Sequence, residues 1–89
     1  MPSHSIRVTG LVQGVFFRDR TKAKAEELGV TGWVKNTEDG AVEIHAEGAE
    51  ESLKMLEEWC KTGPPKARIE AVEIGETKDE HRESFQIYW

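Results

Sequence analysis

The sequence predicts an α+β fold in two layers, with two helices on one face of a mainly antiparallel sheet. Apolar residues alternate with polar ones along several short segments, which is typical of strands that bury one face. Two longer segments repeat apolar residues at helical spacing instead, and glycines and prolines separate the segments. Taken in order, the segments give β-α-β-β-α-β, followed by a small terminal strand.

The first predicted strand and helix are joined by a short loop that contains a glycine. One face of the strand carries Ile6, Val8, Gly10 and Val12. This alternation ends at Gln13-Gly14. Helical spacing then begins, with Phe17, Thr21, Ala25 and Leu28 on one face. Gly29 follows at the position of a C-cap glycine.

The middle of the chain predicts a β-hairpin and then the second helix. Residues 30–37 and 41–47 are the expected strands, and Gly40 in the turn between them is placed for a positive φ angle. The helix is expected over residues 49–62 and ends at Gly63-Pro64-Pro65. Its apolar stripe is expected to comprise Leu53, Leu56, Trp59 and Cys60, with Met55 at the edge. Its solvent side is expected to comprise Glu50, Glu51, Glu57, Glu58 and Lys61.

Two more strands complete the predicted sheet. Residues 68–76 alternate unevenly, with Ile69, Val72 and Ile74 apolar. After a polar connection, Phe85, Ile87 and Trp89 share one face of a short final strand. This order of elements is that of the ferredoxin-like split βαβ arrangement. The arrangement hosts many activities, so it does not fix the function.

Length and composition limit the class of protein. Eighty-nine residues predict one domain spanning residues 1–89, and 37% hydrophobic with 33% charged residues is typical of a folded globular chain. We find no apolar run that could span a bilayer and no signal peptide, so we expect a cytoplasmic protein without a membrane partner. One cysteine excludes an internal disulfide. We expect a monomer.

The charge is unevenly distributed along the chain. The net charge is −5, but residues 1–25 carry five basic residues and one acidic residue, a net +4. Residues 26–89 carry seven basic and sixteen acidic residues, a net −9. An acidic body argues against a nucleic-acid partner, whose binding requires many neutralised phosphates. A local basic end favours one small anion.

The loop before the first helix is a candidate phosphate site. The first amides of a helix have no partner within the helix and carry partial positive charge. A loop with Gly14 can also turn its own N–H groups inward. Arg18 adds a planar guanidinium that matches two phosphate oxygens. The alternative is a purely structural junction in which Arg18 is a solvated surface charge.

The residue types and spacings that this sequence lacks disfavour several kinds of site and reaction. No Ser, Thr or Cys lies between Val12 and Arg18, so a covalent phosphoenzyme is not expected from this loop. The spacing is not that of a Walker-type nucleotide loop. The three histidines, His4, His45 and His81, lack metal-ligand spacing and are expected on strands or at the surface. We therefore predict no metal and no cofactor.

Asn36 is the second candidate residue, because an amide within a strand is unusual. It either caps the following turn or holds a water molecule in line with a bound phosphorus, where a carboxylate would be repelled. Such a site has no general acid, so its leaving group must depart unprotonated, as a carboxylate with a pKa of about 4 does. The predicted substrate is a mixed carboxylic–phosphoric anhydride, cleaved by positioning and charge neutralisation.

Two segments resemble the acylphosphatases. They are GLVQGVFFR at residues 10–18 and GWVKNT at residues 32–37, the latter followed by DGAVE at residues 39–43. The resemblance extends over nearly the whole chain, including the break at residues 63–65 and the aromatic C-terminus.

This resemblance implies a ferredoxin-like fold and metal-free hydrolysis of small acyl phosphates to a carboxylate and inorganic phosphate, which is product and inhibitor. It implies that Arg18 and the loop amides hold the phosphate and that Asn36 positions the attacking water. The residues that match the family's loop are Gln13, Gly14, Val15, Phe16, Phe17 and Arg18. Leu11, Phe16 and the Tyr88-Trp89 end depart from the common pattern, which bears on substrate preference.

Two other classes remain open at this point. One is a non-catalytic acylphosphatase-like module that binds an anion or a protein; the presence of Arg18 and Asn36 weighs against it. The other is an RNA-binding sheet, suggested by Trp33 and the C-terminal aromatic residues. The acidic body and the lack of interleaved aromatic and basic residues weigh against RNA.

Overall fold

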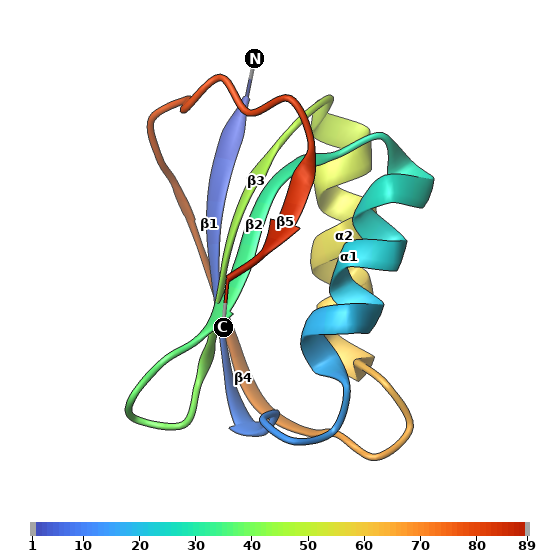
Figure 1. The fold of residues 1–89 in the computed structure, drawn as a ribbon, viewed down its shortest axis with the longest axis vertical. Coiled ribbons are helices and arrows are strands. Elements are labelled where there is room, and N and C mark those ends of the chain that lie inside the picture. The colour runs from blue at the N-terminus through green and yellow to red at the C-terminus, as the bar shows by residue number, and fades with distance from the viewer. Residues whose placement is uncertain (1, 89) are drawn as a thin grey trace.

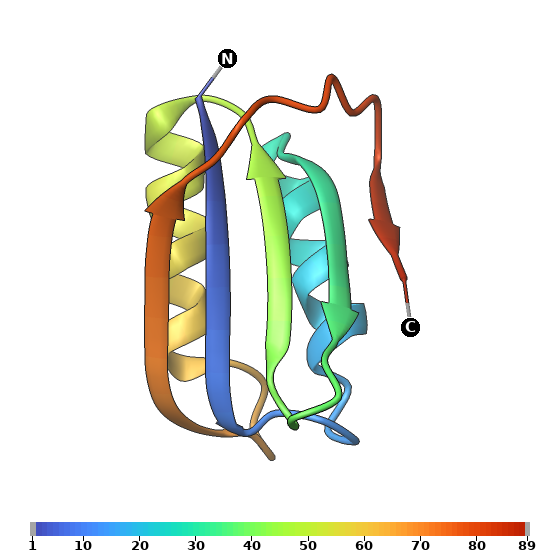
Figure 2. The same ribbon diagram turned by 90° about the vertical axis from the view of Figure 1, so that its left-hand side faces the viewer.

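A computed structural model describes residues 2–88 and confirms the predicted α+β fold. Its elements are β1 (Ser3–Leu11), α1 (Phe17–Leu28), β2 (Thr31–Asn36), β3 (Val42–Glu47), α2 (Glu50–Thr62), β4 (Arg68–Glu76) and β5 (Phe85–Ile87). The sheet order is β4-β1-β3-β2-β5. All pairings are antiparallel except that of β2 with β5. Both helices lie on one face of the sheet (Figure 1), with α2 behind β4 and β1 and α1 behind β3 and β2 (Figure 2).

The core lies between the helices and the sheet, as the apolar spacing predicts. Its fully buried side chains include Ile6, Val8, Val34, Val42, Ile44, Leu53 and Leu56. Phe17, Thr21 and Ala25 form the buried face of α1, and the ring of Phe17 packs against Trp59 of α2 with centroids 5.4 Å apart. No helix within residues 2–88 combines the length and apolar character needed to cross a membrane.

The solvent side of α2 differs from the prediction at one residue. Glu57 was expected to face solvent, and this prediction is wrong: the residue is 8% exposed. It lies one turn beyond Leu53 on the buried stripe, and its carboxylate reaches His4 of β1, with Oε2 2.5 Å from Nδ1. The partner makes this burial tolerable, because a buried charge without one is strongly destabilising. Cys60 is a core residue as predicted, and its burial, together with the nearby Glu57 charge, raises the pKa of its thiol to about 12.

The uneven alternation of β4 is explained by a β-bulge against β1. The register shifts between Thr9 and Gly10, so that Ile69 and Val72 are both partly buried although they have opposite parity. Gly10 has a φ angle of 124°, and a Cβ at this position would lie 2.1 Å from the carbonyl oxygen of Arg68. Only glycine permits this close approach of the two backbones.

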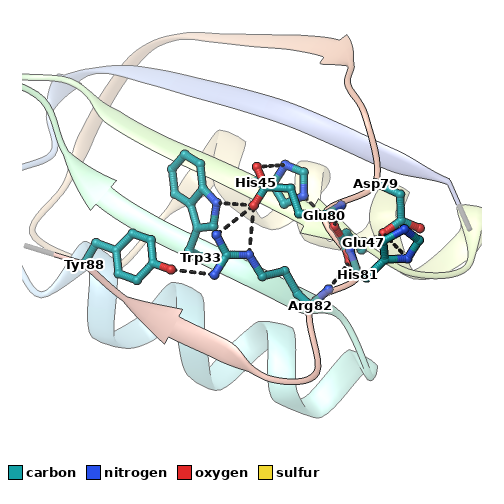
Figure 3. Close-up of polar contacts among 8 residues, drawn as sticks. All are labelled: Trp33, His45, Glu47, Asp79, Glu80, His81, Arg82 and Tyr88. Atoms are coloured by element: carbon teal, nitrogen blue, oxygen red, sulfur yellow. Dashed lines mark hydrogen bonds and ion pairs between the residues drawn. The ribbon is translucent and has the colours of Figure 1, made fainter.

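β5 forms the edge of the sheet beside β2, and the connection that precedes it is held at Glu47 of β3. Phe85 and Ile87, which alternation places on one face of β5, differ in burial, since Phe85 is buried and Ile87 is 36% exposed. Trp89, expected on the same face, lies outside the described residues. The connection from β4 to β5, residues 77–84, is anchored at Glu47 of β3 (Figure 3). This carboxylate accepts hydrogen bonds from the backbone N–H of Glu80 at 2.5 Å and of Arg82 at 2.8 Å.

Candidate active site

A cavity of about 240 Å³ lies at the N-terminus of α1. Its lining residues are Val12, Gly14, Phe16, Phe17, Arg18, Asp19 and Asn36. Arg18 and Asn36, which come from different elements, therefore lie in one cavity. Of the other predicted loop residues, Val15 is packed in the core and Gln13 directs its side chain elsewhere. A larger cavity of about 500 Å³ lies on the open face of the sheet and includes neither Arg18 nor Asn36.

The loop before α1 leaves its backbone donors unused. Gly14 and Phe16 have left-handed φ angles of 76° and 64°, and together they turn the chain sharply from β1 into the helix. No side chain caps the N-terminus of α1. Within residues 2–88, the N–H groups of residues 14–18 donate no hydrogen bond to the rest of the chain. Free amides at a helix N-terminus form a site that favours an anion.

Arg18, the second residue of α1, is partly exposed and also lacks a partner. Its guanidinium makes no hydrogen bond or ion pair with any residue that the structure describes, including its neighbour Asp19. A guanidinium with all its donors free can bind two oxygens of one phosphoryl group at once. Among residues 2–88, no three His, Cys, Asp or Glu side chains are grouped in a way that could hold a metal ion.

Asn36 is the last residue of β2, at the strand end and not in its middle. It shares with Val34 the face of the sheet that the helices cover, so its side chain projects toward α1. Its Oδ1 atom is buried and has no hydrogen-bond partner among the described residues. A buried acceptor without a partner costs about 1–3 kcal/mol, so its retention calls for an explanation.

The turn after Asn36 is held by other residues. Thr37 donates its backbone N–H to the carbonyl oxygen of Ala41 at 2.9 Å, and its hydroxyl accepts the N–H of Ala41 at 3.0 Å. The Thr37 hydroxyl also donates to Asp39, which pairs with Arg7. These two contacts lower the pKa of the Asp39 carboxyl. Asn36 makes none of these bonds, so the structure does not support its interpretation as the turn cap.

Gln13 connects the loop to this turn. Its Nε2 donates to the carbonyl oxygens of Thr37 and Ala41, both at 2.8 Å. Its side chain thereby fixes the loop that carries Arg18 relative to the residue that follows Asn36. The sequence predicted Gln13 as a loop residue but not this contact. The sequence contains one indication of this contact: Gln13 has a side-chain amide with two donor hydrogens and lies between an apolar strand and a glycine.

Comparison with known proteins identifies the family. A family model described as Acylphosphatase matches residues 4–87. An acylphosphatase from Rubrobacter xylanophilus is 54% identical over 71 residues, which are 80% of this chain but only 64% of that protein. One from Thiobacillus denitrificans is 43% identical over 81 residues, 91% of either protein. The crystal structure of acylphosphatase from Bacillus subtilis matches with a TM-score of 0.96 and 38% identity, over 100% of both chains. The chain therefore belongs to the acylphosphatase family of hydrolytic enzymes.

Proposed function

We propose that this protein hydrolyses small acyl phosphates to a carboxylate and inorganic phosphate. In this proposal Arg18 and the backbone N–H groups of residues 13–18 bind the phosphoryl group, and Asn36 positions the attacking water. One observation carries the proposal: the unpaired guanidinium of Arg18, the free amides that begin α1 and the unpaired Oδ1 of Asn36 all border one cavity.

The phosphoryl group of an acyl phosphate carries two negative charges, which suit the groups at this end of α1. The guanidinium supplies a full positive charge and paired donors, while the amides and the helix dipole add partial charge. These groups are fixed before the substrate arrives, so little reorganisation is needed as charge shifts in the transition state. Because inorganic phosphate presents the same oxygens, we expect it to inhibit as a product.

Asn36 is suited to hold water beside this anion. Its buried Oδ1 can accept one hydrogen of a water molecule, and this leaves a lone pair of the water oxygen free to face phosphorus. The amide is neutral, so it is not repelled by the phosphoryl oxygens as a carboxylate would be. Its contribution is to position the water and not to remove a proton.

The reaction step balances without an additional acid or base. The water oxygen forms a bond to phosphorus while the bond between phosphorus and the carboxyl oxygen breaks, and that electron pair stays on the carboxylate. Both protons of the water remain with the phosphate, so a dianionic acyl phosphate yields a carboxylate anion and dihydrogen phosphate. A carboxylate with a pKa of about 4 leaves without protonation, so the step needs neither a metal ion nor a cofactor.

The remaining expectations belong to the same proposal. We infer a single domain over residues 1–89 that acts as a cytoplasmic monomer, with a small molecule as its substrate and no nucleic-acid partner. The acidic balance of residues 26–89 supports the last point, because it would repel a polyanion beyond the cavity.

The test is hydrolysis of acetyl phosphate in excess chelator, with a simple phosphate monoester assayed in parallel. We expect cleavage of acetyl phosphate only, with competitive inhibition by inorganic phosphate. Activity that disappears with the chelator would contradict the metal-free step, and cleavage of the monoester would contradict the leaving-group argument. Phosphate binding by the folded protein without any hydrolysis would favour the non-catalytic module.

A further inference from the structure

Phe16, at the N-cap of α1, combines two unfavourable features. Its φ angle of 64° lies in the left-handed region, which glycine adopts freely but a bulky residue adopts only under strain. Its side chain is 69% exposed, although phenylalanine is among the residues most often buried. Little of the Phe16 side chain is buried, so packing within the protein does not explain why a large apolar residue occupies this strained position.

Phe16 is one of the residues that line the cavity, together with Arg18 and Asn36. The other large apolar side chains of that lining, Val12 and Phe17, are buried in the core. Phe16 thus provides the accessible apolar surface of the cavity. Strained backbone is most often found at functional sites, where a ligand accounts for the geometry.

The proposed reaction defines which part of the substrate lies near this surface. The polar groups of the cavity bind the phosphoryl oxygens, and the acyl group extends from the remaining, bridging oxygen. Because the leaving oxygen lies opposite the attacking water, the acyl group must extend away from the buried Asn36 and toward solvent. Phe16 is the lining residue of the cavity whose large apolar side chain is exposed to solvent, so it is available to contact the acyl group there.

We propose, on the basis of the function proposed above, that Phe16 is a specificity-determining residue that contacts the acyl group. Its ring favours acyl phosphates with an aromatic or long apolar acyl group over acetyl phosphate. Contact removes apolar surface of both partners from water, and two rings gain a further stacking or edge-to-face interaction. The acyl group stays against the ring while the bond to phosphorus breaks, so the contact raises kcat/KM.

The experiment compares kcat/KM for benzoyl phosphate and acetyl phosphate in the wild type, Phe16→Gly, Phe16→Ala and Phe16→Tyr. We expect the benzoyl-to-acetyl ratio to fall about three- to tenfold in the first two variants and to be retained in Phe16→Tyr. The ratio is the readout because an effect of the substitution on the backbone N–H groups that hold the phosphoryl group acts on both substrates alike. Leu11→Ala is the matched control, because Leu11 is 54% exposed but does not line the cavity, and it should leave the ratio unchanged.

Several outcomes would overturn the inference. An unchanged ratio in Phe16→Gly, an equal loss for both substrates, or the same shift in Leu11→Ala would show that the ring does not contact the acyl group. Urea unfolding checks that the variants are folded, and Phe16→Gly should unfold at higher urea than Phe16→Ala because glycine relieves the left-handed strain. A wild type that cleaves neither substrate refutes the proposed function itself, whereas cleavage with an unchanged ratio refutes only the role of Phe16.

Discussion

The polar groups around Glu47 and those around Asn36, at opposite ends of the same sheet, differ in whether they have partners. At one end, the β4–β5 connection is joined to the sheet by a network in which Glu47, 2% exposed, contacts two backbone N–H groups and the imidazole of His45 (Figure 3). In the same network the carboxylate of Glu80 accepts from Trp33 at 3.1 Å and from Arg82 at 2.7 Å. At the other end, where the loop enters α1 (Figure 1), the corresponding groups have no partners.

This difference distinguishes polar side chains that stabilise the fold from polar side chains that are available to bind a ligand. A buried carboxylate with three partners holds an irregular connection in place. Its hydrogen-bonding capacity is occupied within the protein and is not available to a ligand. An unpaired guanidinium and an unpaired buried amide oxygen add nothing to the fold, so their presence in one cavity points to a ligand. The two ends therefore predict opposite consequences of mutation, in stability at one end and in activity at the other.

The largest effect is expected at Arg18. Arg18→Lys keeps the positive charge but loses the planar pair of donors, so kcat/KM should fall about 10²–10³-fold and the inhibition constant for phosphate should rise at least about tenfold. The free energy of unfolding should stay within about 0.5 kcal/mol, since the side chain has no protein partner. Steady-state kinetics and urea unfolding check both points. Arg20→Lys, on the exposed side of the same helix turn, is the control. Wild-type kinetics in Arg18→Lys would refute the assigned role.

The next largest effect is expected at Glu47. In Glu47→Gln one carboxylate oxygen becomes an NH₂ group, which cannot accept from the backbone N–H groups of the connection. We expect the free energy of unfolding to fall by about 2–3 kcal/mol, measured in urea, while kcat of the folded protein is unchanged. Glu43→Gln on the same strand is the control, because the side chain of Glu43 makes no hydrogen bond with a described residue. Equal stability of Glu47→Gln and wild type would mean that the network does not anchor the connection.

A smaller effect is expected at Gln13, which links the loop to the turn after Asn36. Gln13→Ala removes two hydrogen bonds, so the water held by Asn36 should be less well placed, and kcat should fall about tenfold. If Gln13 acts through Asn36, the same change in an Asn36→Ala background should have no further effect on kcat. If the losses of kcat in the two single mutants multiply in the double mutant, Gln13 acts independently of Asn36 and contacts the phosphate directly.

The smallest effect is expected at Asp39, and it depends on pH. The Thr37 hydroxyl and the Arg7 guanidinium lower the pKa of this carboxyl in the folded state. Its contribution to stability is therefore present at neutral pH and is lost as the pH falls through the folded-state pKa, below about 4. Asp39→Asn should be slightly less stable than wild type at pH 7, and the two should unfold alike at about pH 2. Glu38→Gln, the exposed neighbour, should show neither effect. A difference that persists in acid would point to backbone distortion.

The elements of the fold could be predicted because apolar spacing reports directly which face is buried. The spacing of Phe17, Thr21 and Ala25 is that of the buried face of α1, and Leu53, Leu56 and Cys60 define that of α2. The environment of Glu57 could not be predicted, because its partner is His4, far away in the chain. The network at Glu47 could not be predicted either. Its donors lie in the irregular connection between β4 and β5, and the spacing of apolar residues does not predict the path of such a segment.

The site was only partly visible in the sequence. Arg18 follows a strand–glycine–helix pattern, so its place at a helix N-terminus could be predicted locally. Asn36 reaches the same cavity for two reasons that the local sequence does not show. One is the pairing of β2 with β3, and the other is the face of the sheet on which Asn36 lies at the end of β2. The left-handed backbone of Phe16 could not be predicted, because nothing in its residue type favours that conformation.

Asn36→Ala is the variant to measure first, with turnover of acetyl phosphate, inhibition by inorganic phosphate and urea unfolding followed on one preparation. We expect kcat to fall by at least about 10²-fold while phosphate still inhibits, because the water loses its position but the anion site is intact. We also expect the free energy of unfolding to be unchanged or to rise by up to about 1 kcal/mol, because a buried acceptor without a partner has been removed. Turnover at the wild-type rate would mean that Asn36 does not position the water. A clear loss of stability together with loss of phosphate binding would mean that its role is structural.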